Sequence, residues 1–330
     1  MTQPTNVDVH VNAVLTDWAI KYGNSRADFK ADMLAPIVES TKQSNKFWSY
    51  DKAPWFTDEM QKRGPGAPVP LAGYTMSSVL FEIDVWSLGK PIDDQTRDNE
   101  DDILDSDEDA TQFLTDKALL RREKSFSDAC LSTGKWGTDV TGNTSASDFS
   151  ADTVAQWDDG DSHPLLDIAE YRERVKLATG LWPNVLVLGS SVWKSLKNHD
   201  DILERITGGS NNGNPAKVTL ELVAGLMELE EVVIMDAVVN TATAPKAMTG
   251  EFIAGAHGLL MHRNVNAGRK GATAVKTMTW RRKGADRNGT RILKSVMDIH
   301  RDLIEIESNF THKICAADLG VFFNGLVASP

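Results

Sequence analysis

The sequence predicts an α+β protein with a compact centre and two extended parts. Three observations lead to this prediction. Helical and strand patterns alternate between residues 164 and 261, which is typical of a compact α/β unit. Extended, alternating patterns stand on both sides of that unit, at 46–90 and 272–307. One long helical pattern, at 107–131, lies between the first extended stretch and the centre.

The size and composition fit a protein with a large core and no disulfides. A chain of 330 residues can bury roughly 75% of its unfolded surface. Cys130 and Cys315 are far apart in sequence and form no Cys-x-x-Cys pair, so we expect buried free thiols in a reducing compartment. The N-terminus lacks a signal-peptide pattern, and no apolar run reaches the ~18 residues that cross a membrane. We therefore expect neither export nor a membrane partner.

The first extended part predicts an arm followed by a long hairpin. Residues 1–45 have weak periodicity, so we expect an arm with one helix, at 25–34, that Pro36 ends. Aromatic and β-branched residues then stand on both sides of KRGPGAPVPLAG, residues 62–73, which predicts a hairpin with an irregular tip. Strand arms of about 15 residues would reach about 50 Å. Such a ribbon exposes its edges for pairing with another chain.

The acidic run before the long helix invites a calcium interpretation. Asp105, Asp107 and Asp109 alternate as in an EF-hand loop. However, Ala110 stands where that loop needs glycine, and Asp116 stands where it needs a bidentate glutamate. We interpret the acids instead as favourable charges at the N-terminal end of a helix about 37 Å long. Metal binding is disfavoured, and no cofactor is expected.

Residues 181–206 predict a buried strand, a turn and a helix, an arrangement that many enzymes use for a phosphate loop or a catalytic serine. The pattern G-x-S-x-G fails because Gly189 directly precedes Ser190. The glycine-rich segment 208–215 lacks the Lys and Ser/Thr of a phosphate loop. We interpret Ser190 or Ser191 as a helix cap. A serine hydrolase or nucleotide-binding enzyme remains a distant alternative.

The rest of the chain predicts further regular elements. We expect a loop region with short strands at most at 134–160. Helices are expected at 164–180, 191–206 and 219–229, and strands at 185–188, 232–235 and 252–261. In 272–307 the segment GADRNGT, residues 284–290, predicts a hairpin turn between two long strands.

Charge is unevenly distributed along the chain. Residues 82–109 hold twelve acids and two bases, whereas residues 262–301 hold eleven Lys/Arg and two Asp. These stretches could meet within one molecule, meet between copies of the chain, or both face solvent. The net charge of −12 argues against a general nucleic-acid binder. The candidate residues for contacts between copies are Lys62, Arg63, Asp93, Asp94, Asp101, Asp102, Arg281, Arg282, Lys283 and Arg287.

The order of these parts resembles the major capsid protein of tailed bacteriophages, whose fold is shared with herpesvirus shells and encapsulins. The resemblance is strongest in SHPLLDIAEYRERVKLATGLWPNVLVLGSSVWKSLKNHDDILERI, residues 162–206. Further support comes from KFWSYDKAPWFTDEMQKRGPG, LGKPIDDQTRDN and DATQFLTDKALLRRE. These segments are structural signatures, so they imply a shell fold without implying a reaction.

The resemblance implies a division of the chain into four parts. They are an N-terminal arm (1–45), an extended-loop hairpin (46–95), a peripheral domain with a spine helix and a long β-hairpin (96–164 and 262–310), and an axial domain (165–261 and 311–330). No motif fixes a cross-linking partner for Lys62, so no cross-link is inferred.

The resemblance also implies a function. We expect a viral structural protein, without enzymatic activity, that assembles through pentamers and hexamers into an icosahedral shell enclosing double-stranded DNA. The implied partners are a scaffolding protein, a portal protein and a decoration protein, and the implied location is the virion, assembled in the host cytoplasm. An encapsulin-like shell of a cellular nanocompartment is the alternative.

Overall fold

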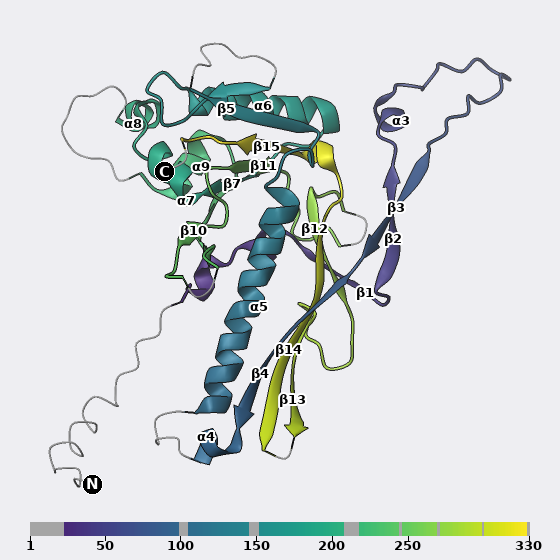
Figure 1. The fold of residues 1–330 in the computed structure, drawn as a ribbon. Helices are drawn as coiled ribbons and strands as arrows, with labels where there is room; N and C mark the ends of the chain where they lie inside the picture. The colour runs from purple at the N-terminus through teal and green to yellow at the C-terminus, as the bar shows by residue number, and fades with distance from the viewer. Residues whose placement is uncertain are drawn as a thin grey trace, which may run out of the picture.

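The computed structural model describes residues 23–98, 105–144, 152–207, 218–243, 246–268, 271–298 and 300–328. Its described part contains two large sheets, one at one end of a long helix, α5 (Ser106–Cys130), and one alongside that helix, and a hairpin that projects to one side (Figure 1). The helix occupies the range that the sequence predicts. Asp105 caps it by accepting hydrogen bonds from the backbone N–H groups of Asp107 and Glu108, which agrees with the interpretation of these acids as part of the helix start.

The six-stranded sheet forms the compact centre. Its strand order is β6 (Thr153–Ala155), β5 (Thr138–Asn143), β15 (Gly320–Asn324), β11 (Gly258–Met261), β7 (Val185–Gly189) and β8 (Glu231–Met235). The helices α6 (Pro164–Thr179), α7 (Ser190–Leu196), α8 (Asp200–Thr207) and α9 (Leu220–Leu226) belong to the same region. The predicted strand at 185–188 is confirmed, and every residue of β7 is buried. The predicted helix at 164–180 is also confirmed, because Gly180 ends α6 at φ 75°.

Alternation along the strands divides the core between the two faces of this sheet. Leu186 and Phe323 pack into one hydrophobic cluster with the helices, whereas Val187 and Phe322 pack into a second cluster with Phe126 of α5. Neighbouring residues of one strand point to opposite faces, so each strand contributes to both clusters. This explains why β7 is a continuous apolar run.

Two expectations in this region are wrong in detail. The helix expected at 191–206 is two helices, because the Nδ1 atom of His199 accepts the backbone N–H of Asp201 and starts α8 after a break. The strand expected at 252–261 is also divided, into β10 (Gly250–Phe252), which pairs with β9 (Val238–Asn240), and β11. Gly255, at φ 54°, lies in the turn between them.

The second sheet packs against α5. β14 (Arg301–Ile314) is its long central strand, with β4 (Asp84–Asp93) along one edge. Along the other edge lie β13 (Thr290–Asp298) and β12 (Val275–Trp280), end to end, because β13 pairs with the first half of β14 and β12 with its end. β1 (Ile37–Ser40) completes the sheet beside β12.

The expectation of a hairpin turn at 284–290 is therefore wrong. Residues 281–289 carry the chain from β12 to the start of β13 without pairing those two strands, and the actual hairpin joins β13 to β14. Gly289 permits this path, because a Cβ atom there would lie 2.3 Å from the carbonyl oxygen of Asn309. The backbone N–H of Asn309 donates to the Gly289 carbonyl at 2.9 Å.

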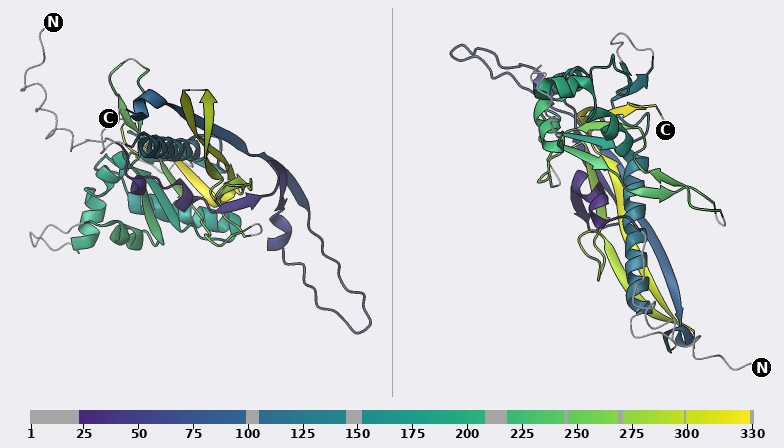
Figure 2. Two further views of the ribbon diagram at one scale, coloured as in Figure 1. Left: turned by 90° about the horizontal axis from the view of Figure 1, so that it is seen from below. Right: turned by 90° about the vertical axis from the view of Figure 1, so that its left-hand side faces the viewer.

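The projecting hairpin has shorter strands than the sequence predicts. β2 (Ser44–Tyr50) pairs with β3 (Met76–Glu82), and between them lie the short helix α3 (Ala53–Phe56) and an irregular tip (Figure 2). After buried Ile83 the chain leaves the hairpin and continues as β4 in the second sheet. Because β4 pairs with β14 in the second sheet, its residues do not lengthen the hairpin.

The ends of the described chain also differ from expectation. Instead of one helix at 25–34, the chain forms a 3-10 turn, η1 (Arg26–Asp28), and a single helical turn, α2 (Ala31–Leu34). The short helices α4 (Asp94–Asp98) and η2 (Ala317–Leu319) precede α5 and β15. The segment 96–164, which was expected to belong wholly to the peripheral domain, is divided between the two regions, because its strands β5 and β6 pair within the six-stranded sheet. No helix in the described ranges combines the length and the apolarity needed to cross a membrane.

Candidate assembly surfaces

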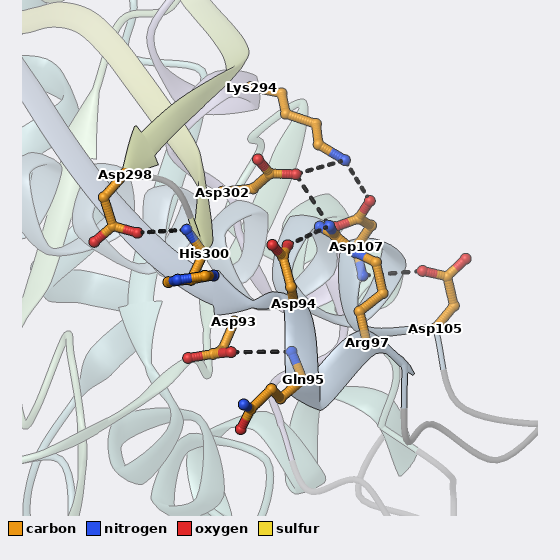
Figure 3. A network of polar contacts seen from close by, with 10 residues as sticks. All are labelled: Asp93, Asp94, Gln95, Arg97, Asp105, Asp107, Lys294, Asp298, His300 and Asp302. Atoms are coloured by element: carbon orange, nitrogen blue, oxygen red, sulfur yellow. Dashed lines mark hydrogen bonds and ion pairs between the residues drawn. The ribbon is translucent and has the colours of Figure 1, made fainter.

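An ion-pair network at the far end of α5 connects the acidic and basic stretches within one subunit (Figure 3). Arg97 of α4 contacts Asp107 of α5 at 2.8 Å and Asp302 of β14 at 3.0 Å. Lys294 of β13 contacts Asp107 at 2.6 Å. Hydrogen bonds from Lys294 and Arg97 hold the pKa of Asp107 below its ordinary value. Part of the charge asymmetry is thus neutralised inside the subunit.

Two of the predicted contact residues lie beside this network. The Oδ1 atom of Asp93 accepts the backbone N–H of Gln95 at 3.0 Å, and Asp94 lies 3.8 Å from Arg97. Both side chains are on the surface, so Asp93 in particular can still meet another molecule. Asp101 and Asp102 lie outside the described residues.

The cations of the 281–287 loop divide into two kinds. Arg282 pairs with Glu307 of β14, which is also held by Arg291 at 2.7 Å and is only 8% exposed. Arg281, Lys283 and Arg287 are exposed, and no ion pair to any of them is found among the described residues. The sequence grouped these four cations together, whereas the structure separates Arg282 as an internal partner. The remaining three form what we call the basic loop.

The hairpin carries the other two predicted cations and an exposed aromatic cluster. Lys62 and Arg63 are exposed, and the Nε atom of Arg63 donates to the Ala67 carbonyl at 2.5 Å. The aromatic cluster consists of Tyr50, Trp55 and Tyr74, whose ring centroids are 5.8, 5.9 and 6.1 Å apart. Each of these rings keeps more than half of its residue surface exposed. Such a cluster is unusual for a surface that stays in water.

Two contacts join the hairpin to the central sheet region at the point where its paired strands end and its tip begins. Lys52 forms an ion pair with Asp318 of η2. The ring of Phe56 lies over Gly180, where a Cβ atom would come within 2.8 Å of the ring. Between the hairpin and the body is a cavity of about 640 Å³, lined among others by Tyr50, Asp51 and Cys315. The hairpin is therefore held up to α3, and only the irregular tip beyond α3 projects free of these contacts.

A buried carboxylate attaches the start of the described chain to α5. Glu123 is fully buried, and its Oε2 atom accepts the backbone N–H groups of Lys30 at 2.9 Å and Ala31 at 2.8 Å. Its Oε1 atom has no hydrogen-bond partner among the described residues. Burial raises the pKa of Glu123 to about 7, against the opposing effect of these two hydrogen bonds. The neighbouring Arg122 pairs with Asp32, which strengthens the same attachment.

The serines considered for catalysis have other environments. Ser190 and Ser191 are the first residues of α7, and the cap position is Gly189, which makes no side-chain hydrogen bond. The predicted serine cap is therefore wrong. A Cβ atom on Gly189 would lie 2.0 Å from the carbonyl oxygen of Gly255, so the end of β7 requires glycine. The helix α7 begins at the next residue, Ser190. Neither serine forms a hydrogen bond to a general base among the described residues.

A serine–histidine pair does occur elsewhere, and its hydrogen bonds oppose catalysis. Ser162 lies 2.8 Å from the Nε2 atom of His199, and both residues are buried. Because the Nδ1 atom of His199 accepts the N–H of Asp201, the neutral ring carries its proton on Nε2 and donates to the serine. The hydroxyl of Ser162 donates to the Asp159 carbonyl at 2.7 Å. A base that activates serine must accept its proton, which this arrangement does not do.

Sequence reasoning missed three of these features. Arg97 was counted only as a base within an acidic stretch, and Glu123 only as part of a helix. The aromatic cluster had a signal in the density of aromatic residues at 47–56, but Tyr74 joins it from the opposite arm of the hairpin. Each feature depends on contacts between residues that are distant in sequence.

Comparisons with known proteins identify a relative in sequence and several in fold. The chain is 26% identical over 229 residues, 69% of each chain, to the major capsid protein of Burkholderia phage BcepMu. No family model matches the chain. A phage-related protein of Bordetella bronchiseptica RB50 has a TM-score of 0.65 at 15% identity, over 93% of this chain and 95% of that one. The capsid protein of cyanophage P-SCSP1u gives 0.60 at 10% identity, over 98% and 95%.

The fold is also found in a shell that is not a phage capsid. The SrpI encapsulin of Synechococcus elongatus PCC 7942 has a TM-score of 0.55 at 9% identity, over 100% of this chain and 99% of that one. At such identities the structural likeness establishes the fold, while the likeness in sequence is to a phage capsid protein. The chain therefore has the fold of the tailed-phage major capsid proteins, and its predicted resemblance to them is confirmed.

Proposed function

We propose that this chain is the major capsid protein of a tailed bacteriophage, whose copies form pentamers and hexamers and close into an icosahedral shell around double-stranded DNA. The observation that carries the proposal is the sequence likeness to a phage major capsid protein, over 69% of both chains, on a chain with the same fold. The non-catalytic hydrogen bonds of the serines favour a structural role.

The surfaces of the subunit support contacts between copies. The hairpin projects from the body and exposes large apolar side chains, including Trp48, Trp55, Met60 and Leu71. Burial of each of these side chains would contribute roughly 1.5–3 kcal/mol of free energy, which is absent while they are exposed to water. A second copy that covers them would recover this free energy.

Charge supplies a means of orienting the copies. The basic loop of Arg281, Lys283 and Arg287 is exposed, and so are Lys62 and Arg63 of the hairpin. The exposed Asp93 and the half-buried Asp94 lie at the far end of α5. Complementary charged patches accelerate association and select its register. We assign these residues to contacts between copies, with Arg282 excepted because it pairs with Glu307.

Further partners follow from the same proposal. Copies that meet through heterologous contacts can close into shells of several sizes, so we expect a scaffolding protein to select one size. A portal protein at one vertex and a decoration protein on the outside complete the proposed virion, which would assemble in the host cytoplasm. The net charge of −12 suits a shell that encloses DNA without gripping it.

Electron microscopy of the purified protein tests this function. We expect capsomers and closed shells, of mixed diameters when the chain is expressed alone. A monodisperse monomer under all assembly conditions would contradict a shell protein. The encapsulin alternative, which the fold of SrpI makes specific, predicts closed particles of one uniform size from this chain alone, loaded with protein instead of DNA.

A further inference from the structure

The hairpin combines two features that complement each other: an exposed aromatic cluster and a proline-rich tip. The cluster residues Tyr50, Trp55 and Tyr74 are 52%, 64% and 59% exposed, although their rings are in mutual contact. Their faces and edges form a surface that is more rigid than single exposed side chains would be, because each ring contacts the other two. No described residue of the subunit covers this surface completely.

The tip is shaped in advance for binding such a surface. The backbone N–H of Ala67 donates to the Gly64 carbonyl at 3.2 Å, and Gly66 at φ 80° completes a tight turn. Beyond the turn come Pro68, Val69 and Pro70, which are exposed and form no helix or strand. Proline fixes its own φ and restricts the preceding residue to extended conformations. The segment 67–71 therefore loses little conformational entropy when it binds.

We propose that residues 68–70 of one copy stack on the aromatic cluster of a neighbouring copy. The proposal rests on the proposed function, since it names one contact through which the copies assemble. Proline rings and the intervening Val69 would lie against the faces of Trp55 and the two tyrosines. Proline-rich segments bind aromatic grooves in the same way in other recognition systems, because the extended backbone is formed before binding.

Charges beside the two surfaces are complementary. Lys62 and Arg63 precede the tip, and their side chains are exposed. Asp51, Asp58 and Glu59 lie next to the cluster in sequence and are exposed, and no ion pair to them occurs within the described ranges. Lys52, the neighbour of Asp51, pairs with Asp318, while Lys62 is the cation closest in sequence to Asp58 and Glu59. A tip that approaches the cluster of another copy would thus bring two cations to three acids.

The tip of one copy does not contact the aromatic cluster of the same copy. The chain runs outward from α3, and the tip projects away from the strands that hold the cluster (Figures 1 and 2). A contact from the tip of each copy to the cluster of the next is heterologous, and such a contact repeats around a ring. This is the type of closure that a capsomer needs.

A peptide titration tests the contact without requiring assembly. The probe is a fluorescein-labelled peptide of residues 62–73, titrated with the soluble full-length subunit and followed by fluorescence polarisation. We expect saturable binding that Trp55→Ala weakens by at least about tenfold, the equivalent of about 1.4 kcal/mol. Trp48→Ala is the matched control, because Trp48 is 63% exposed on the same hairpin but lies outside the cluster. Its affinity should stay within about twofold of wild type.

Peptide variants identify which part of the tip binds. Replacing both Pro68 and Pro70 by alanine should abolish binding, whereas Pro65→Ala, in the turn, should leave most of it. If the peptide without Pro68 and Pro70 binds as well as the original, and a peptide with Lys62→Ala and Arg63→Ala does not bind, the cluster holds a cation and the proposal is wrong. It is equally wrong if Trp55→Ala and Trp48→Ala behave alike, or if the wild-type subunit shows no saturable binding up to about 1 mM peptide.

Assembly separates this inference from the proposed function. In the full chain, Pro68→Ala with Pro70→Ala should reduce shell formation, while Pro65→Ala and Trp48→Ala should not, with circular dichroism confirming that each variant folds. Shells from wild type and from the double proline variant in equal yield would remove the contact but keep the capsid function. The absence of shells from wild type, with peptide binding intact, would remove the function but keep the binding site. Tyr74→Leu serves as a second cluster variant where Trp55→Ala fails to fold.

Discussion

The carboxylate of Glu123 accepts a 2.8 Å hydrogen bond from the backbone N–H of Ala31, and so fastens the first helical turn of the described chain to the middle of α5. The carboxylate is buried, and its second oxygen has no partner in the described part of the chain. Burial raises its pKa from 4.5 to about 7. The folded state is therefore more stable when this group is protonated, even though its two backbone hydrogen bonds favour the ionised form.

The first prediction concerns Glu123→Gln. Because the folded state holds the proton more tightly, the stability from this group is fully present below pH 4.5 and decreases as the pH rises to about 7, by about 3 kcal/mol. Glutamine can still accept the hydrogen bonds but does not ionise. The free energy of unfolding of the variant relative to wild type should thus rise between pH 4.5 and 7, as measured by urea denaturation.

The comparison with wild type removes other pH effects. Burial lowers the pKa of His312 to about 3, so its contribution has the opposite sign and is lost as the pH falls from 6.5. Both proteins share this contribution, and also the charges of Lys30, Asp32 and Arg122 around Glu123. Parallel pH profiles for variant and wild type would show that Glu123 does not titrate in this range.

The second prediction separates the cations of the 281–287 loop. Arg281→Glu with Lys283→Glu should leave the thermal midpoint within about two degrees of wild type, because exposed charges contribute little to folding. The same variant should assemble poorly if the basic loop meets acids of another copy. Normal shell yield by light scattering would assign these cations to solvent instead.

Arg282→Glu should behave differently from that pair. It would place a carboxylate against Glu307, which is 8% exposed, and so should destabilise the subunit by on the order of 3 kcal/mol. Arg282→Gln is the milder control, since it removes the ion pair without adding a negative charge. Equal stability of the two variants would mean that like-charge repulsion plays no part.

The third prediction is that deleting residues 64–70 leaves the subunit folded. The hydrogen bonds of this segment are confined to the tip, such as that of Arg63 with Ala67, and its side chains are mostly exposed. Circular dichroism and the thermal midpoint should be close to wild type, whereas shells should be rare in electron micrographs. An unfolded deletion variant would place the tip in the core of the subunit.

The fourth prediction concerns the serines. Double replacement of Ser190 and Ser191 by alanine should change stability by less than about 0.5 kcal/mol, because neither caps α7. Ser162→Ala should cost about 1–3 kcal/mol, since it leaves the buried Nε2–H of His199 without its acceptor. A fluorophosphonate probe should label none of the three, and labelling of any would reopen the hydrolase alternative.

The fifth prediction is that Gly189→Ala severely destabilises the protein. The new Cβ atom would meet the Gly255 carbonyl oxygen at 2.0 Å, and backbone lies on both sides of that contact. We expect a loss of more than about 3 kcal/mol, comparable to overpacking in a core. Gly225→Ala is the control, because nothing lies within 4 Å of its Cβ position. A wild-type thermal midpoint for Gly189→Ala would refute the close approach.

The elements that the sequence predicted correctly are those with a strong local signal. The helix α5, the strand β7 and the helix α6 follow from periodicity, from a continuous apolar run, and from Pro164 and Gly180 at the two ends. The overall resemblance to a phage capsid protein was equally readable, and the likeness over 229 residues confirms it. These signals lie within one segment, so no knowledge of distant contacts is needed to read them.

The tertiary structure alone decided which segments meet. Only the register of β14 reveals that β12 and β13 lie end to end and that residues 284–290 form no hairpin. The ion pair of Arg282 with Glu307, the two backbone hydrogen bonds to Glu123 and the contact of Tyr74 with Tyr50 likewise join residues far apart in sequence. Local periodicity determines whether a segment is helical or extended, but the partner of a strand or charge is selected by burial and pairing summed over the whole fold.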